Sequence, residues 1–503
     1  MVGKKKQDNL ISRPPIVVVL GHVDHGKSSL LEAIKDFEIT SKESGGITQH
    51  VGAYEVEHKR KKITFIDTPG HEAFSAIRAR GAQVADVAIL VVDSSDTVQP
   101  QTKEAINVVK KAEIPMIVVL NKIDKPTADQ EKIKRELLKV DIIVESMGGK
   151  VPSIEVSAKT KQGIDELLEL ILLVAEMEGL KADIKVPAEG IIVESYMDCF
   201  RGPIATLIVQ NGILKRKDII GTSSALAKIK NLQDFQGKEI EQVYPSQPAV
   251  VLGFEKSPWV GEKFKTYVSI DEATANIKEE EEKKELPNTA FTLKDDQKVL
   301  NMILKVDVVG SLEAIVDVLK ELPQEKIILR ILKEEVGDIN EADMKLAGIC
   351  NGQIIGFRVK INPSVLQAMK KDKEKKVKIK TFDVIYNLIQ EVRQMMEKTL
   401  EPEVSRQDIG KVKTLLVFWG EKNRQIVGGK IIEGEVRKGL KIEVLRDEKK
   451  VGEGKIVNLQ RNKKDIEKLV KGDECGVLFE GNVKIQEKDI LSFYTEERKK
   501  GEL

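Results

Sequence analysis

The feature that most constrains this chain is the segment Gly21–Ser28, which follows the apolar run Ile16–Leu20. A β-branched run, the pattern G-x-x-x-x-G-K-S and the helix-like segment Ser29–Ile34 predict a strand, a phosphate-binding loop and a helix. Glycines let backbone N–H groups turn inward around phosphates, and the helix N-terminus adds partial positive charge. The residues expected to hold phosphates are Gly21, His22, Val23, Asp24, His25, Gly26, Lys27 and Ser28.

Length and charge set the scale of the molecule. The chain has 503 residues, enough for about three to four domains. It carries 82 basic and 81 acidic residues, so any RNA-binding surface must be a local patch. Aromatic residues make up only 4%, which argues against single-strand binding by aromatic stacking.

Cysteine content and hydropathy bear on the compartment. The chain has three cysteines, Cys199, Cys350 and Cys475, which are far apart in sequence. They exclude a disulfide framework and a four-cysteine zinc site and suit a reducing compartment. No apolar stretch approaches the roughly 20 residues of a membrane helix, and the polar N-terminus lacks the core of a signal peptide. We expect a cytoplasmic protein without a membrane partner.

The first part of the chain alternates short apolar runs with helical patterns. This alternation predicts a mostly parallel sheet with helices on both faces. The runs expected to be strands are Ile16–Leu20, Ile63–Ile66, Val87–Val92, Met116–Leu120 and Ile154–Val156. The segment Ile164–Leu172 is expected to be the closing helix.

The rhythm changes beyond residue 186. Short strands with Gly, Pro and Asn-Gly turns predict a small β-barrel, followed by the charged run Lys278–Glu285, which suits a solvated helix face or a linker. An α/β pattern then returns, in which Ser311 is expected to cap a helix. Asp383–Leu400 has helical apolar spacing over about 27 Å. Beyond it, strand and glycine patterns predict a second barrel.

These patterns divide the chain into seven expected segments. They are a short basic tail (1–13), an α/β domain with the phosphate loop (14–180), a β-barrel (186–270), a charged linker (271–296), an α/β domain (297–381), a connecting helix (382–401) and a C-terminal β-barrel (402–503).

The base-specific motif follows the fourth predicted strand as Asn121-Lys122-Ile123-Asp124. The Asp124 carboxylate can accept from guanine N1–H and the exocyclic N2 amine, whereas ATP would leave it unpaired. Ser157-Ala158-Lys159, after the last strand, supplies a backbone N–H for guanine O6. Because each motif ends a strand, together they indicate GTP and GDP.

Two further loops are candidate switches. Asp67-Thr68-Pro69-Gly70 ends a strand, so Asp67 is expected to hold Mg²⁺ through water and the Gly70 N–H to sense the γ-phosphate. Thr48, in Gly45-Gly46-Ile47-Thr48, is expected to complete the Mg²⁺ shell with Ser28. An ordinary loop hydroxyl is the alternative for Thr48.

His71 directly follows the Asp-Thr-Pro-Gly element. A single histidine is usually structural or exposed, but this position is that of the residue that orients the attacking water in phosphoryl transfer. General base chemistry and orientation by charge are both compatible with it. His22, His25, His50 and His58 lack metal-ligand spacing, so no zinc site is expected.

Together these motifs resemble the translational GTPases. Gly21–Ser28, Gly45–His50 and Asp67–Phe74 are similar specifically to the bacterial translation initiation factor two family. The resemblance extends from about residue 14 over nearly the whole chain. Its further segments are Arg201–Thr206 in the second domain, Val309–Ala314 and Val384–Ile389 in the third domain and helix, and Asp473–Gly476 in the last barrel.

The resemblance implies a fold and a set of partners. The fold class is multidomain α/β: a P-loop GTPase domain with a mostly parallel sheet, a β-barrel, an α/β sandwich-like domain, a long connecting helix and a C-terminal β-barrel. The implied function is a GTP-dependent factor that places formylmethionyl initiator tRNA on the small ribosomal subunit and promotes large-subunit joining. Ribosome-stimulated hydrolysis, contact with other initiation factors and a monomer off the ribosome are also implied.

The resemblance also assigns residues. Val23 and Ile47 match the family's apolar gate beside His71. The C-terminal barrel is the family's initiator-tRNA module, and the matching positions are Arg461, Lys463, Glu474, Cys475 and Gly476. A strand entry with a buried cysteine is an equal alternative for 474–476. Gly429 stands where the family commonly has a cysteine, and Asn462 stands in place of an aromatic residue. We expect the chain to lack the long N-terminal extension of bacterial members.

Two other classes share part of this pattern. An elongation factor of the tRNA-carrying type would have a second β-barrel directly after the first, whereas this sequence returns there to an α/β pattern. A non-ribosomal regulatory GTPase with C-terminal protein-binding modules is the other alternative. Protection of the ester bond of formylmethionyl-tRNA separates it from an initiation factor.

Overall fold

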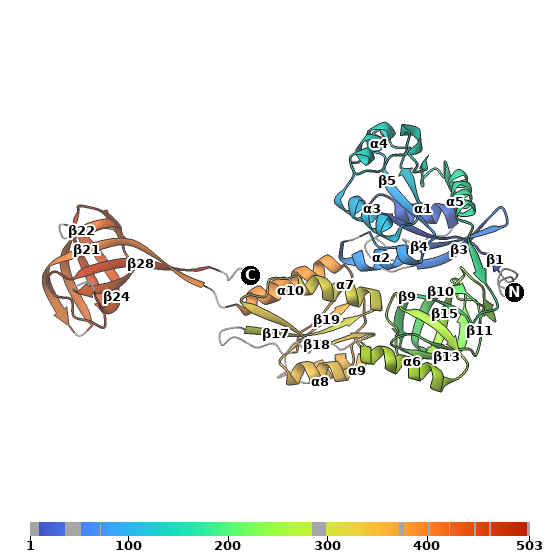
Figure 1. Cartoon of the computed structure of the whole chain (residues 1–503). Helices are drawn as coiled ribbons and strands as arrows, with labels where there is room; N and C mark the ends of the chain where they lie inside the picture. Colours follow the sequence, from blue (N-terminus) through green and yellow to red (C-terminus); the bar gives the residue numbers. More distant parts are fainter. Residues whose placement is uncertain are drawn as a thin grey trace. The chain divides into compact units, whose positions relative to one another are not determined.

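The structure is a computed structural model. It describes residues 10–35, 52–70, 72–283, 298–371, 377–400, 403–421, 423–446, 449–461 and 464–499. The chain divides into two compact units, Met1–Gln394 and Met395–Leu503, whose elements are labelled in Figure 1. Within the described residues, no helix combines the length and apolar character needed to cross a membrane.

The first sheet carries the phosphate loop. Its six strands lie in the order β3-β4-β2-β5-β6-β7, and β3 pairs antiparallel with β4 while the other pairings are parallel. The five predicted runs overlap β2 (Ile16–Gly21), β4 (Lys61–Asp67), β5 (Val87–Asp93), β6 (Met116–Asn121) and β7 (Ser153–Glu155). The edge strand β3 (Gly52–His58) was not predicted. The parallel-sheet fold class is confirmed.

Helices cover both faces of this sheet, as Figure 1 shows. They are α1 (Lys27–Lys35), α2 (Ser75–Val84), α3 (Pro100–Ala112), α4 (Gln130–Leu138) and α5 (Ile164–Glu178). Val17 and Val19 share a core with α1 and α5. On the opposite face Gly81 of α2 packs so closely that a Cβ there would lie 3.3 Å from Val18. Alternate β2 residues therefore bury against different helices, which keeps the whole strand inaccessible to water.

A closed six-stranded barrel follows, in the order β10-β15-β13-β12-β16-β9. Its strands are β9 (Glu189–Asp198), β10 (Gly202–Asn211), β12 (Ile219–Gly221), β13 (Leu226–Gln233), β15 (Pro248–Phe254) and β16 (Lys263–Tyr267). The helix α6 (Ile270–Lys283) comes next. It occupies the first half of the segment expected to be a charged linker, and a helix was one of the two expectations for Lys278–Glu285.

A four-stranded parallel sheet in the order β18-β17-β19-β20 comes after α6. Its elements are β17 (Lys298–Val306), α7 (Val309–Lys320), β18 (Ile327–Val336), α8 (Glu341–Ile349), β19 (Gln353–Phe357), α9 (Pro363–Lys371) and β20 (Ile379–Phe382). The prediction that Ser311 caps α7 is wrong, because α7 begins at Val309 and Ser311 is buried in its first turn. Glu194 of the barrel instead accepts from the Gly310 N–H at 3.4 Å.

The predicted connecting helix is α10 (Ile385–Thr399). It has 15 residues and is therefore about 22 Å long, shorter than expected. Leu388, Val392 and Met396 are fully buried on one stripe, so the apolar spacing serves packing. The division between the two compact units falls inside this helix.

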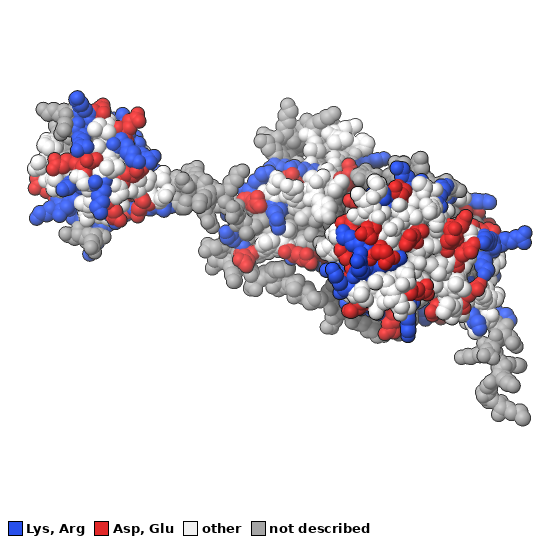
Figure 2. All heavy atoms as spheres, turned by 90° about the horizontal axis from the view of Figure 1, so that it is seen from above, with Lys and Arg blue, Asp and Glu red and all other residues white. Residues whose placement is uncertain are grey.

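The second unit is the expected C-terminal barrel. Its strands are β21 (Glu403–Glu421), β22 (Arg424–Arg437), β23 (Lys441–Arg446), β24 (Lys449–Arg461), β25 (Lys464–Asp465), β26 (Lys468–Val470), β27 (Glu474–Gly481) and β28 (Ile490–Lys499). Pairing of β21 with both β28 and β22 closes the ring. Figure 2 shows acidic and basic side chains interspersed on the visible face, in keeping with the balanced composition.

A largely buried ion pair at the start of the first domain also contacts the barrel that follows it. Arg13 follows β1 (Leu10–Ser12), which pairs with β8 (Lys181–Asp183). Its guanidinium contacts both carboxylate oxygens of Asp86 at 2.7 Å and the Ser246 hydroxyl of the barrel at 3.1 Å. The two charged side chains are only 15% and 11% exposed. Such a bidentate pair fixes geometry as well as contributing energy.

Asp86→Asn should therefore destabilise the first unit. Removing the charge leaves Arg13 buried without its counter-ion, at a cost of about 3 kcal/mol, which corresponds to about 3–4 °C in the melting temperature of a unit of this size. Differential scanning calorimetry measures this shift. The matched control is Asp317→Asn, whose partner Lys320 forms an exposed pair and whose loss should change stability by less than about 0.5 kcal/mol. Equal melting temperatures for both variants would contradict this account.

Candidate functional site

The phosphate loop turns out of β2 into α1 through two strained positions. Gly21 has φ +144° and Gly26 has φ +87°, a region that side chains disfavour. A Cβ at Gly21 would overlap the Val91 carbonyl oxygen, and one at Gly26 would lie 2.5 Å from the Asn121 amide. Both glycines are therefore required by close approach of neighbouring strands as well as by the turn.

Lys27 lies inside this loop. Its ammonium donates to the carbonyl oxygens of Gly21 at 3.0 Å and His22 at 2.8 Å. Burial is the main cause that lowers the pKa of Lys27 to about 8, and the nearby Asp67 carboxylate partly opposes it. A buried cation surrounded by backbone dipoles suits an anionic ligand, because the phosphate charge would replace the lost hydration.

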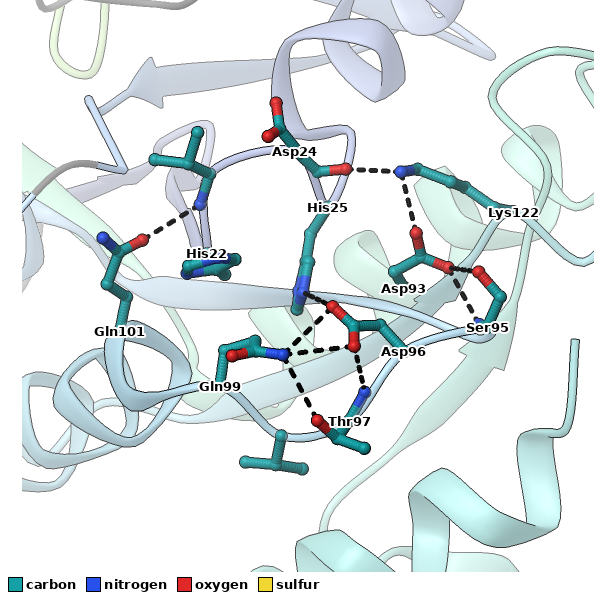
Figure 3. Close-up of polar contacts among 12 residues, drawn as sticks. His22, Asp24, His25, Asp93, Ser95, Asp96, Thr97, Gln99, Gln101 and Lys122 are labelled. Atoms are coloured by element: carbon teal, nitrogen blue, oxygen red, sulfur yellow. Dashed lines mark hydrogen bonds and ion pairs between the residues drawn. The ribbon is translucent and has the colours of Figure 1, made fainter.

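Two histidine rings lie beside each other on the loop, as Figure 3 shows. The rings of His22 and His25 meet edge to face, with centroids 5.0 Å apart. Burial, and then the neighbouring His22, lower the pKa of His25 to about 4. The ring of His25 is therefore neutral near pH 7. Its Nε2 lies 3.7 Å from the Asp96 carboxylate, too far for a hydrogen bond.

Asn121 connects the phosphate loop to both predicted guanine loops. Its side chain is fully buried at the end of β6. The amide nitrogen donates to the His25 carbonyl at 3.0 Å, and the amide oxygen accepts from the Ala158 N–H at 3.2 Å. One side chain therefore fixes the spacing between the phosphate side and the base side of the site.

Asp124 is held by its neighbour loop. The Ser157 hydroxyl donates to the Asp124 carboxylate at 2.7 Å. This hydrogen bond is the main cause that lowers the pKa of Asp124, and the charge of Lys159 adds to it. The carboxylate is thus ionised, oriented and exposed, as a receptor for two N–H donors of a base must be.

Lys122 reaches across the loop rather than into solvent, as Figure 3 shows. Its ammonium contacts the Asp24 carbonyl and lies 2.8 Å from the Asp93 carboxylate. Lys125 lies 3.1 Å from the same carboxylate oxygen, and Ser95 donates to the other oxygen. Although burial opposes it, these hydrogen bonds hold the pKa of Asp93 far below its ordinary value. Asp93 was missed in the sequence because its lysine partners, Lys122 and Lys125, lie about 30 residues away.

The switch residues are only partly described. Asp67 is 2% exposed at the end of β4, and the Thr68 hydroxyl donates to the Val19 carbonyl at 2.9 Å. Gly70 lies against the loop, because a Cβ there would be 3.1 Å from the Val23 nitrogen and would overlap the Lys27 ammonium. Ile47, Thr48 and His71 lie outside the described residues.

Another loop contact was not predicted. The Val23 N–H donates to the side-chain oxygen of Gln101 on α3 at 3.1 Å. Gln101 is buried and follows a proline at the start of α3. A sequence offers no signal for such a contact, because it depends on how α3 packs beside the loop.

The second unit contains a cavity of about 560 Å³. Its lining combines four of the sequence-predicted residues with an apolar wall: Leu415, Leu416, Phe418, Ile426, Gly428, Gly429, Gln460, Arg461, Glu474, Cys475 and Gly476. Lys463 and Asn462 lie outside the described residues. The Phe418 side chain is 66% exposed at this cavity.

The glycines of β22 make room for this cavity. A Cβ at Gly428 would lie 2.7 Å from the Phe418 ring, and one at Gly429 would lie 2.5 Å from Val412. Gly429 pairs with Cys475 on β27, whose thiol donates to the Gly429 carbonyl at 3.5 Å. Burial, together with Asp473, raises the pKa of Cys475 to about 12. The thiol is therefore neutral and unreactive, and Gly429 is dictated by the space beside Val412.

Family models match most of the chain. Residues 12–177 match the elongation factor Tu GTP binding domain, residues 187–267 match elongation factor G domain 2, and residues 275–393 match translation-initiation factor 2. The first match covers the phosphate and base loops.

Whole-chain relatives carry one name, translation initiation factor IF-2. The chain is 42% identical to that of Pelotomaculum thermopropionicum, over 100% of this chain and 53% of the relative. It is 41% identical to the factor of Thermotoga sp. strain RQ2, and the match covers 98% of this chain and 72% of the relative. It is 40% identical to the factor of Dehalococcoides mccartyi, and the match covers 99% of this chain and 84% of the relative. The chain thus spans between about half and four-fifths of the length of these relatives.

The neutral His25 predicts a pH dependence of stability. Its pKa falls from 6.5 to about 4 on folding, so between these values the unfolded chain binds more protons. Stability is therefore unaffected by His25 above about pH 6.5 and is lost as the pH falls below it, by about 2 kcal/mol near pH 5.

Denaturant unfolding near pH 5 and near pH 7.5 measures this loss. His25→Gln should show a smaller difference between the two pH values, because glutamine does not titrate. His22, Lys27, Asp93 and Asp96 surround the ring and remain in both proteins, so their contribution cancels. An identical pH difference in the variant would rule out the assigned protonation state.

Proposed function

The chain belongs to the translation initiation factor IF-2 family, and from this premise we propose that it is a GTP-driven carrier of formylmethionyl initiator tRNA. It would place that tRNA on the small ribosomal subunit, promote joining of the large subunit and hydrolyse GTP when the ribosome activates it. The proposal rests on two features found in one chain. The first is the pair of phosphate and guanine loops that Asn121 holds together, and the second is the open cavity beside Phe418.

Guanine would be read by Asp124. The Ser157 hydroxyl occupies part of the carboxylate and orients it, so the remaining lone pairs face N–H donors of the base. Adenine presents an acceptor at N1 and no amine at C2, which would leave the carboxylate unpaired. The Ala158 N–H is bound to Asn121, and Lys159 lies close enough to influence Asp124.

The phosphates would occupy the loop of Gly21–Ser28, with Lys27 turned from the backbone carbonyls to the β- and γ-phosphates. Mg²⁺ fits the oxygen donors at this edge, the Ser28 hydroxyl and the buried Asp67 carboxylate, because this cation prefers hard oxygen ligands. When bound, it neutralises charge on the phosphates. We propose Thr48 as a third oxygen donor from the switch loop.

Hydrolysis would depend on the segment after Gly70. We propose that His71 orients the attacking water and that Val23 and Ile47 form an apolar gate beside it. Without an activator the attacking water would not be oriented for reaction, so hydrolysis by the free protein should be slow. The large ribosomal subunit would complete the site.

The cargo would bind in the cavity of the second unit. The apolar wall of Leu415, Leu416 and Phe418 suits the methionine side chain. Arg461 and Glu474 at the rim suit the polar formyl and ester groups and the terminal phosphates. Arg461 is paired with Asp473 at 3.1 Å and 48% exposed, so an incoming phosphate can compete for it.

The parallel sheet after the first barrel disfavours an elongation factor of the tRNA-carrying type. A second barrel would stand there in such a protein, whereas β17, β18, β19 and β20 form a wholly parallel sheet. Other initiation factors as partners and a monomeric state off the ribosome complete the proposal.

Asp124→Asn should shift the nucleotide preference from GTP to xanthosine triphosphate. The amide loses an acceptor that guanine needs, while the C2 carbonyl of xanthine accepts from the new N–H group. GTP affinity should fall by at least about a hundredfold. Competition against a fluorescent nucleotide measures both affinities, with Asp165→Asn, an 84% exposed carboxylate, as the control that keeps GTP preference. Equal ATP and GTP affinity in the unmodified protein would refute the guanine assignment.

The cargo proposal is tested by the ester bond of formylmethionyl-tRNA. Bound in the cavity, this bond should hydrolyse more slowly at micromolar protein than in its absence. Phe418→Ala should weaken protection about tenfold, because it removes one large apolar contact. Val451→Ala, a 41% exposed residue outside the cavity lining, is the matched control. Failure of the folded, unmodified protein to protect the ester would remove the initiation proposal.

A further inference from the structure

We propose that Arg78 and Glu104 are a positioning pair that orients the Gly70 N–H for the γ-phosphate and so sets the preference for GTP over GDP. The inference rests on the proposed function, in which the phosphates occupy the loop of Gly21–Ser28. It concerns two residues that no sequence motif singled out. Both lie on helices that pack beside the loop, Arg78 on α2 and Glu104 on α3.

Arg78 is the largest fully buried side chain among the described residues, with 1% of its surface exposed. One guanidinium nitrogen donates to the Pro69 carbonyl at 2.9 Å. Another donates to the Glu104 carboxylate at 2.6 Å. A buried arginine is costly unless paired and hydrogen-bonded, and here one partner, Pro69, belongs to the switch loop while the other, Glu104, belongs to α3.

The contact with Pro69 fixes the next residue. The Pro69 carbonyl and the Gly70 N–H belong to one planar trans peptide, so they point in opposite directions. Holding the carbonyl toward Arg78 therefore directs the N–H away from Arg78. Gly70 lies over the loop, where a Cβ would be 3.2 Å from the Gly21 carbonyl and 3.1 Å from the Val23 nitrogen.

Glu104, which lies on a second helix, is the other partner of Arg78. Its side chain is 28% exposed, so it anchors Arg78 at the edge of the core. A lysine could not hold both partners in the same fork geometry, because arginine presents several N–H groups in one rigid plane. The positive charge of Arg78 also reaches the loop, since it contributes to the lowered pKa of Lys27.

Only a triphosphate should depend on this pair. GDP lacks the γ-phosphate that the Gly70 N–H would meet, so loss of the pair should leave GDP affinity within about twofold. Affinity for a non-hydrolysable GTP analogue should fall about tenfold, the size of one charge-assisted hydrogen bond. A merely structural role would weaken both nucleotides together.

The experiment measures both affinities by isothermal titration calorimetry in Arg78→Met and Arg78→Lys. The lysine variant can still donate to the Pro69 carbonyl but cannot hold Glu104 in the same geometry, so it should recover only part of the GTP-to-GDP affinity ratio. Glu104→Gln keeps the size of the side chain and weakens the anchor, so it should show the same change even where Arg78→Met does not fold. Asp86→Asn, which breaks a buried arginine pair elsewhere in the domain, is the matched control and should lower stability without changing the ratio.

An unchanged ratio in Glu104→Gln and in folded Arg78→Met would overturn the inference, as would an equal loss of both nucleotides. Failure of the unmodified protein to bind any guanine nucleotide would instead overturn the proposed function, and the inference with it. A changed ratio in Asp86→Asn would show that stability alone moves the preference, and this too would overturn the pair's role.

Discussion

The nucleotide site depends on the buried amide of Asn121. This one side chain donates to the phosphate loop at the His25 carbonyl and accepts from the base loop at the Ala158 N–H. Without it, two loops that end different strands would have no fixed separation, and a nucleotide that must touch both would bind poorly. The hydrogen bonds are also buried, so their loss would leave unpaired groups at a cost of about 1–3 kcal/mol each.

Contacts between residues far apart in the sequence also join the domains of the first unit. Arg80 of α2 pairs with Glu313 of α7, and the Glu194 carboxylate of the barrel meets the start of α7. The helix that follows the switch loop therefore contacts the third domain directly. A displacement of α2 on nucleotide exchange would act on α7 through these contacts. The cavity lies in the other unit, beyond α10.

Features with a local sequence signal could be predicted, whereas features that depend on distant residues could not. The strand runs and the loop of Gly21–Ser28 were recognisable because hydrophobic period and glycine spacing are local signals. The edge strand β3 was missed because its alternation is weak and it pairs on one side only. The Ser311 cap was wrong because the acceptor at the start of α7 comes from Glu194, more than a hundred residues away.

In the candidate site, too, residues in local motifs could be predicted, whereas residues placed by the packing of distant elements could not. Asp124 and Ser157 were both predicted to belong to the guanine site, and they lie within hydrogen-bond distance of each other. Asp93 and Gln101 were not predicted, because their roles depend on the packing of β5 and α3 against the loop. The exposure of Phe418 could not be read from its strand pattern, since closure of the barrel and the glycines of β22 decide it.

The central claim is that a guanine-specific phosphate loop waits for the ribosome before it hydrolyses its nucleotide. Multiple-turnover GTP hydrolysis, measured with and without ribosomal subunits, tests it most directly. We predict slow turnover by the free protein and stimulation of at least about a thousandfold when both subunits are present, with subunits alone as the background. Equal turnover with and without ribosomes would contradict the account.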